Sequence, residues 1–188
     1  MVNRTERWDG LSLARSATNA ERRELMRRGT APDFDRLVGW EFAGVNTAWH
    51  TPIVGIRKFK KGFYRGPARA PSGPEPCIHG YNVNVRQNGV GEPHIAKPSE
   101  DRPTRHSFYR VYAASAGPRR NYDNALMLDY GLGGGFALNP ARLLRDYLVQ
   151  VYPDDPDLLL GHAFAALGIW IPLSFFVLVR NNEHDFSG

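Results

Sequence analysis

The sequence predicts an all-β protein whose eight antiparallel strands close into an up-and-down barrel. Three observations lead to this class. Strand-like runs of β-branched and aromatic residues follow one another from residue 39 to residue 180, with few helical signals between them. Glycine and proline occur 19 and 14 times in 188 residues, which is typical of many turns. An open sheet of eight strands would expose two edges, and closure removes both.

Alternation of side chains identifies the individual strands. The clearest segment, Tyr81–Arg86, has one apolar face and a polar stripe of two asparagines and an arginine, the period of two expected of a strand. This polar stripe either faces water or lines the interior of the barrel. The other predicted strands are Trp40–Asn46, Arg57–Tyr64, Ser107–Ala113, Ala125–Tyr130, Tyr147–Tyr152, Leu158–Leu167 and Leu173–Arg180.

Two helices are predicted. Thr18 and Glu21 have the spacing of a capping box, which predicts a helix from there to Arg28. A shorter helix, from an Asn139 cap to Arg145, precedes the sixth strand. We therefore expect residues 1–38 to form an N-terminal arm and a helix that packs on or caps the barrel. Residues 39–182 form the barrel, and residues 183–188 form a polar tail.

The segment of residues 158–179 has an alternative interpretation. Its 22 residues contain no Asp, Glu, Lys or Arg, which is long enough for a membrane-spanning helix. Gly161, Gly168 and Pro172 interrupt it, however, and His162 would lie in the hydrocarbon. Two buried strands joined by a turn account for the same residues. A membrane is therefore not expected as a partner.

Charge and cysteine content limit the setting. The net charge is +5, and the basic excess lies in residues 1–72, where 14 basic side chains face 7 acidic ones. Such a surface either attracts anionic partners or is simply solvated. Cys77 is the only cysteine, which excludes an internal disulfide and fits a cytoplasmic location. Residues 1–20 are charged throughout, so no signal peptide is expected.

The start of the barrel carries a family resemblance. A helical stretch leads into Leu37-Val38-Gly39-Trp40, and about 140 residues of β pattern follow. This arrangement resembles the lipocalin-like (calycin) barrels, whose fingerprint is Gly-x-Trp, whereas the glycine and tryptophan are adjacent here. The resemblance is to an intracellular, bacterial-type member rather than to a secreted carrier. It implies an eight-stranded barrel that encloses a small hydrophobic molecule.

No cofactor or metal is predicted. The glycine-rich segment Gly131–Gly135 lacks both the third glycine of a dinucleotide fingerprint and the lysine of a phosphate loop. The six histidines lack metal-binding spacing. The basic-aromatic run at residues 57–65 lacks the signature of an RNA-recognition sheet, so we expect an outer wall with solvated lysines and no nucleic-acid partner. The oligomeric state is not predicted.

The predicted function is binding of a small hydrophobic molecule in the barrel cavity. Several strands are apolar on both faces, which suits a barrel that packs on helices and also encloses a cavity with a few polar groups. The residues expected to contact the ligand are Trp40, Asn46, Tyr81, Tyr109, Phe164 and Trp170.

The alternative function is an enzyme built on the same barrel. An isomerase, cyclase or dehydratase would act on a hydrophobic substrate such as a natural product, with His162, Asp129 and Tyr130 as acid-base groups. His162 is the leading polar group because it lies mid-strand among apolar residues, although a core histidine bonded to a tyrosine fits the same pattern. Asp129 either is half-buried or faces outward.

Overall fold

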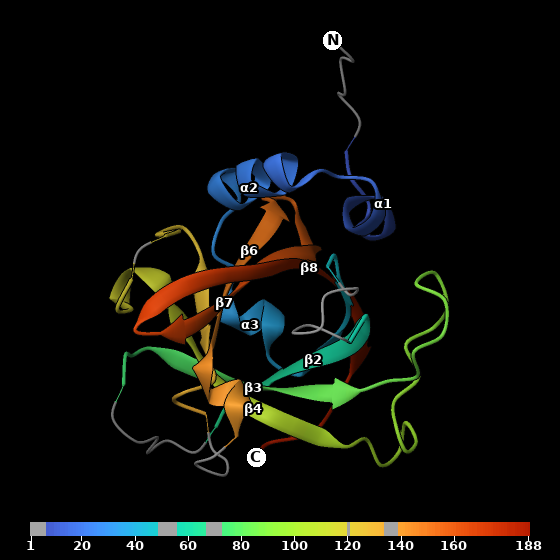
Figure 1. Ribbon diagram of the computed structural model, residues 1–188. Coiled ribbons are helices and arrows are strands. Elements are labelled where there is room, and N and C mark those ends of the chain that lie inside the picture. Colours follow the sequence, from blue (N-terminus) through green and yellow to red (C-terminus); the bar gives the residue numbers. More distant parts are fainter. Residues whose placement is uncertain (1–6, 49–55, 67–72, 120, 134–138) are drawn as a thin grey trace.

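The computed structural model describes residues 7–48, 56–66, 73–119, 121–133 and 139–188. Eight strands form a closed antiparallel barrel in which neighbours in sequence are neighbours in space and the last strand pairs with the first (Figure 1). The predicted all-β barrel is confirmed. Its strands are β1 (Trp40–Asn46), β2 (Lys58–Tyr64), β3 (Cys77–Asn84), β4 (Arg105–Ala113), β5 (Leu126–Asp129), β6 (Leu144–Tyr152), β7 (Asp155–Leu167) and β8 (Ile169–Glu183).

Strand bounds differ from the sequence prediction mainly at strand ends. β3 begins at Cys77, β6 begins at Leu144 and β8 runs to Glu183. The helix predicted before the sixth strand is the short 3-10 turn η2 (Pro140–Leu143), and Asn139 caps it through Ala141 N. A second 3-10 turn, η1 (Ala114–Ala116), follows β4. Pairing with neighbouring strands extends these elements beyond the residues whose side chains alternate.

Two helices, α1 (Gly10–Arg15) and α2 (Asn19–Arg28), lie outside the barrel along β6, β7 and β8 (Figure 1). The predicted capping box begins α2, because Thr18 Oγ1 accepts from Glu21 N and the Glu21 carboxylate accepts from Thr18 N. The sequence did not predict α1. Asp9 caps it by accepting hydrogen bonds from the backbone of its first turn.

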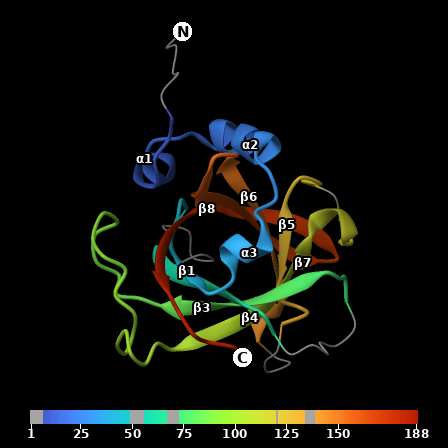
Figure 2. The same ribbon diagram turned by 180° about the vertical axis from the view of Figure 1, so that it is seen from behind.

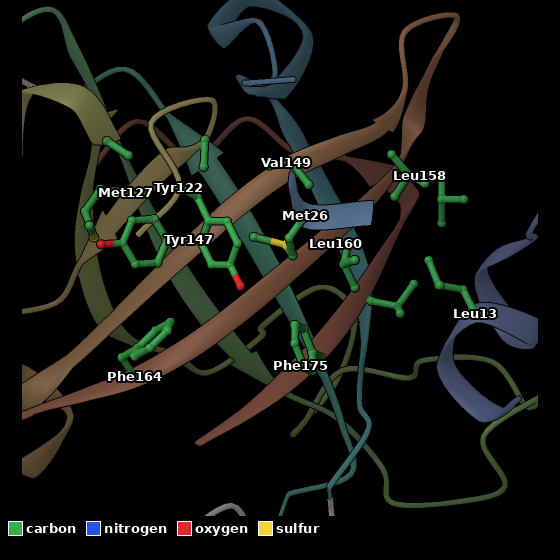
Figure 3. Packing of buried hydrophobic residues seen from close by; sticks show 14 of the residues in the cluster. Leu13, Met26, Tyr122, Met127, Tyr147, Val149, Leu158, Leu160, Phe164 and Phe175 are labelled. Carbon is green, nitrogen blue, oxygen red and sulfur yellow. The ribbon is translucent and has the colours of Figure 1, made fainter. Parts of the chain in front are cut away.

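A second hydrophobic core fills the space between these helices and the outer face of the barrel. Met26 of α2 lies beside Val149, Leu160 and Tyr147, with Phe175 behind them (Figure 3). Residues 158–179, which include most of this outer face, form β7 and β8. Among the described helices, none has the length and hydropathy needed to cross a membrane. Apolar residues on both strand faces therefore serve two cores.

A third helix, α3 (Phe34–Leu37), closes one end of the barrel. Leu37 is completely buried and packs in the same cluster as the interior side chains Phe42, Phe63 and Leu178. Seen from behind, α3 lies at the centre of the barrel outline (Figure 2). The interior is therefore packed at this end, and the cavity described below lies at the opposite end.

The connection between β3 and β4 lies against the outer face of β1 and β2. Lys58 Nζ donates to Asn88 Oδ1 and to the carbonyl oxygen of Glu92, each at 2.6 Å, and Lys60 Nζ lies 2.9 Å from Glu100 Oε2. Both lysines are buried. The expectation of solvated lysines on the outer wall was therefore wrong, because the irregular connection uses them as donors for its own oxygen atoms.

Candidate functional site

The barrel encloses a cavity of about 210 Å³ at the end opposite α3. It reaches the surface beside Ile56, which is 47% exposed. A dry core cavity of about 150 Å³ is enough for benzene, so this space suits one small ring molecule. The lining residues are Asn46, Ile56, Phe59, Lys61, Asn82, Asn84, His106, Tyr130, Leu144, Asp146, Ala163, Leu173, Ser174 and Phe176.

A buried polar cluster of Lys61, Asn82, Tyr130 and Asp146 forms the base of the cavity. Lys61 Nζ lies 3.0 Å from Asn82 Oδ1 and 3.4 Å from Asp146 Oδ2, and it also contacts the Tyr130 hydroxyl. Tyr130 in turn donates to Asp146 Oδ2 at 3.2 Å. The Lys61 and Asp146 side chains are only 3% and 5% exposed, so the pair is screened little by water.

Burial shifts the titration of this cluster. It lowers the pKa of Lys61, and the negative charge of Asp146 opposes that change. It raises the pKa of Asp146, which the positive charge of Lys61 opposes. The pKa of Tyr130 is raised well above its ordinary value, first by burial and then by Asp146, so the phenol stays protonated at neutral pH. The cluster thus holds one cation, one anion and a neutral donor.

Aromatic rings surround the Lys61 ammonium. Its Nζ lies 4.7 Å from the ring centroid of Tyr109 and 5.0 Å from that of Tyr130. The rings of Phe176 and Phe59 follow at 5.3 and 5.6 Å. Such cation–π contacts favour the charged form of a buried lysine, which supports an ion pair with Asp146.

A β-bulge brings His106 to the cavity. Gly80 pairs with Tyr109, whereas Asn82 pairs with His106, so β4 has one extra residue at this point. Ser107, in the bulge, has φ +47°, a backbone conformation that residues other than glycine rarely adopt. The bulge changes which face His106 occupies. Its Nε2 then lies 3.0 Å from Asn84 Oδ1, and burial with nearby Lys61 lowers the pKa of the imidazole.

The structure places three of the sequence-predicted site residues in or beside the cavity. Asn46 and Tyr130 line it. Tyr109 lies inside the barrel, with its ring centroid 4.9 Å from that of Tyr130. Asn82 and Asn84, whose orientation the sequence left open, also line the cavity. Trp40 lies at the beginning of β1, beneath the Arg180 guanidinium, and is not part of the lining.

The remaining predicted residues lie on the outer face of the barrel. His162, Phe164 and Trp170 pack in or against the cluster under α2, and Tyr81 packs in a separate cluster with Phe186. Asp129 accepts from Tyr112 OH and pairs with Arg145 Nε, each at 3.0 Å. The structure thus does not bring these groups to the cavity. The reason is strand phase, because neighbouring residues of a strand point to opposite faces.

His162 is a buried, neutral histidine within the outer cluster. Its Nδ1 lies 3.0 Å from Tyr122 OH, and its ring stacks on Phe175 with a centroid distance of 4.0 Å. Burial, with a smaller contribution from Arg23, lowers its pKa from 6.5 to about 4. This arrangement matches the alternative of a core histidine bonded to a tyrosine.

The low pKa of His162 predicts a pH dependence of stability. The unfolded chain takes up this proton near pH 6.5 and the folded protein only near pH 4, so stability falls as the pH falls between these values. Between pH 7 and pH 4 we expect the protein to lose about 1–3 kcal/mol more than the His162→Phe variant does. Urea unfolding of both proteins across this range measures the difference. Equal slopes would contradict the assignment.

The sequence reasoning missed Lys61 and Asp146, although alternation carries a signal for both. Lys61 lies between Phe59 and Phe63 on one strand face, within a basic run that was interpreted as outer wall. Asp146 shares a face with Leu144 and Leu148, but the predicted strand began at Tyr147. A lone charged residue on an otherwise apolar strand face, found on two strands with opposite signs, is the signal for a buried pair.

Comparison with known proteins gave no relative, because neither the protein-family models nor the curated protein sequences contain a match. The closed eight-stranded barrel is compatible with a calycin-like fold. Within the described part of the chain, no three His, Cys, Asp or Glu side chains gather as metal ligands would. Residues 134–138, which include part of the glycine-rich segment, lie outside the described residues.

Proposed function

We propose that the protein binds a small, largely apolar molecule in the barrel cavity. The observation that carries this proposal is a cavity of about 210 Å³ with apolar walls above a polar base. Binding sites for small molecules combine these two features. The walls are formed by Ile56, Phe59, Leu144, Ala163, Leu173 and Phe176.

The resemblance to lipocalin-like barrels supports the same function. An eight-stranded barrel has an interior that is either filled by side chains or able to hold one small ligand. Here α3 and the side chains around Leu37 fill one end, while the other end retains a cavity. The location in the cytoplasm, and the expectation of neither nucleic-acid nor membrane partners, stay predictions.

Blocking the cavity tests the proposal. Ala163 lines the cavity, and in the Ala163→Phe variant a ring would occupy the space that the ligand needs. We expect the wild-type protein to bind 4-ethylphenol at one site by isothermal titration calorimetry, and the variant to bind it at least about tenfold more weakly, since the overlap removes the burial of the ligand's apolar surface.

A matched variant controls for the general effect of an added ring. Ala166 pairs with Trp170 near the tip of the β7–β8 hairpin and is not part of the cavity lining, so Ala166→Phe should bind 4-ethylphenol as the wild-type protein does. The proposal fails if neither 4-ethylphenol nor ethylbenzene binds to the wild-type protein. It fails equally if Ala163→Phe, folded by circular dichroism, binds them unchanged.

A second candidate function is acid-base catalysis in the same cavity. It is favoured by the Tyr130 phenol and the Asp146 carboxylate, a donor and an acceptor 3.2 Å apart beside the Lys61 ammonium. Such a pair can move a proton in an isomerisation, cyclisation or dehydration of a bound hydrophobic molecule. In this alternative Asp146, rather than Asp129 or His162, is the acid-base partner of Tyr130. Mass spectrometry of the recovered small molecule distinguishes an enzyme, which converts it, from a carrier.

A further inference from the structure

The hydrogen-bond donors of the buried cluster are directed at the cluster itself. An ammonium group has three N–H donors, and Lys61 Nζ has three partners in the cluster: Asn82 Oδ1, Asp146 Oδ2 and the Tyr130 hydroxyl. The Tyr130 hydroxyl donates to Asp146 Oδ2. A ligand that offers only an acceptor would therefore compete with bonds already formed.

One acceptor of the cluster is in the opposite situation. Asp146 lines the cavity, and its Oδ1 atom is buried without a hydrogen-bond partner among the residues that the structure describes. The other oxygen, Oδ2, accepts from Tyr130 and contacts Lys61. A buried charged oxygen atom without a donor is costly. The composition of the lining thus favours a ligand that supplies a donor.

The charge of the lining excludes ionic ligands. Of the residues that line the cavity, Lys61 and Asp146 carry charge at neutral pH, and they lie 3.4 Å apart, where each offsets the other. A carboxylate or an ammonium group would enter a buried space without an opposite charge of its own, which is unfavourable. Fatty acids are therefore disfavoured, and so are amines.

We propose that the cavity takes a neutral, ring-sized molecule that carries a hydroxyl group, such as a phenol or a cyclic alcohol, and that this hydroxyl donates to Asp146 Oδ1. The apolar ring would lie against Phe59 and Phe176, which line the same cavity. This inference rests on the proposed function and adds the chemical class of the ligand. It also explains why an aspartate with a single-sided set of partners is retained at the base of the cavity.

A series of matched probes tests the ligand class on the wild-type protein. We expect 4-ethylphenol to bind at least about tenfold more tightly than ethylbenzene or 4-ethylanisole, because only the phenol donates a hydrogen bond to a charged acceptor. The anion 4-ethylbenzoate should bind most weakly. If ethylbenzene binds as tightly as 4-ethylphenol, or if 4-ethylbenzoate binds best, the inference is overturned while cavity binding stands. If none of the probes binds, both proposals fall.

Two variants place the preference at Asp146. Asp146→Asn should reduce the preference for 4-ethylphenol over ethylbenzene to about threefold or less, since the acceptor loses its charge. Glu41→Gln is the matched control, because Glu41 is another buried carboxylate that pairs with a buried lysine, Lys60, on the outer side of the barrel. It should keep the preference. An unchanged preference in folded Asp146→Asn would contradict the inference, and the wild-type probe series decides the matter if that variant does not fold.

Discussion

Replacing Lys61 by methionine is expected to lower the free energy of unfolding by about 3–5 kcal/mol. The Asp146 side chain is 5% exposed, and the variant removes the cation beside it while keeping most of the volume of the lysine stem. The carboxylate would then be buried without its counter-charge, which is much costlier than loss of a surface ion pair. Urea unfolding at pH 7 measures this change.

A double variant separates the lost pair from lost packing. In Lys61→Met/Asp146→Leu both charges are gone, and apolar groups of similar size replace them. We expect this protein to regain most of the stability that the single variant loses, because an apolar pair avoids the desolvation of two ions. A loss below about 1 kcal/mol in the single variant would show that Asp146 is not a buried, charged partner of Lys61.

Gly161→Ala is expected to weaken both stability and ligand binding. Gly161 pairs with Phe176 across β7 and β8, and a methyl group at this glycine would overlap the phenylalanine ring. Because Phe176 lines the cavity, the displaced ring would enter the space of the ligand. We expect unfolding to become easier by about 1–3 kcal/mol and the affinity for 4-ethylphenol to fall. Urea unfolding and calorimetry measure the two effects.

A shorter side chain at position 176 provides the control. In Gly161→Ala/Phe176→Leu the ring that would collide with the new methyl group is absent, so the two substitutions should destabilise the protein by less than the sum of their separate effects. Strict additivity would mean that the ring and the glycine are not in contact. Phe59 lies over Gly44 in the same way on the β1–β2 pair, so two rings lie flat against the inner wall and leave room for the cavity.

The fold was predictable because local signals agree with the global structure. Alternation located all eight strands, and the capping box at Thr18 located α2. Strand ends were less accurate, since pairing with a neighbour continues where alternation stops, as at Cys77 and Leu144. The helix α1 was missed because its six residues carry no apolar period of their own. Its position depends on packing against β8.

The site was predictable only in part. Alternation divides a strand into two faces without showing which face is inside, and here α1 and α2 make the outer face of β7 and β8 as apolar as the inner one. His162 was therefore assigned to the cavity although it faces α2. The bulge at Ser107, which brings His106 to the cavity, depends on strand register. Asn46 and Tyr130 were found because both belong to the inward face near strand ends.

A crystal structure of the protein with 4-ethylphenol tests the central claim most directly, namely that the cavity above Lys61 and Asp146 is a binding site. The account predicts electron density for the ring in contact with Phe59 and Phe176, with its hydroxyl within hydrogen-bonding distance of Asp146 Oδ1. Density for the phenol in the outer groove between α1 and β1, which Leu11 and Val45 line, with none inside the barrel, would contradict it.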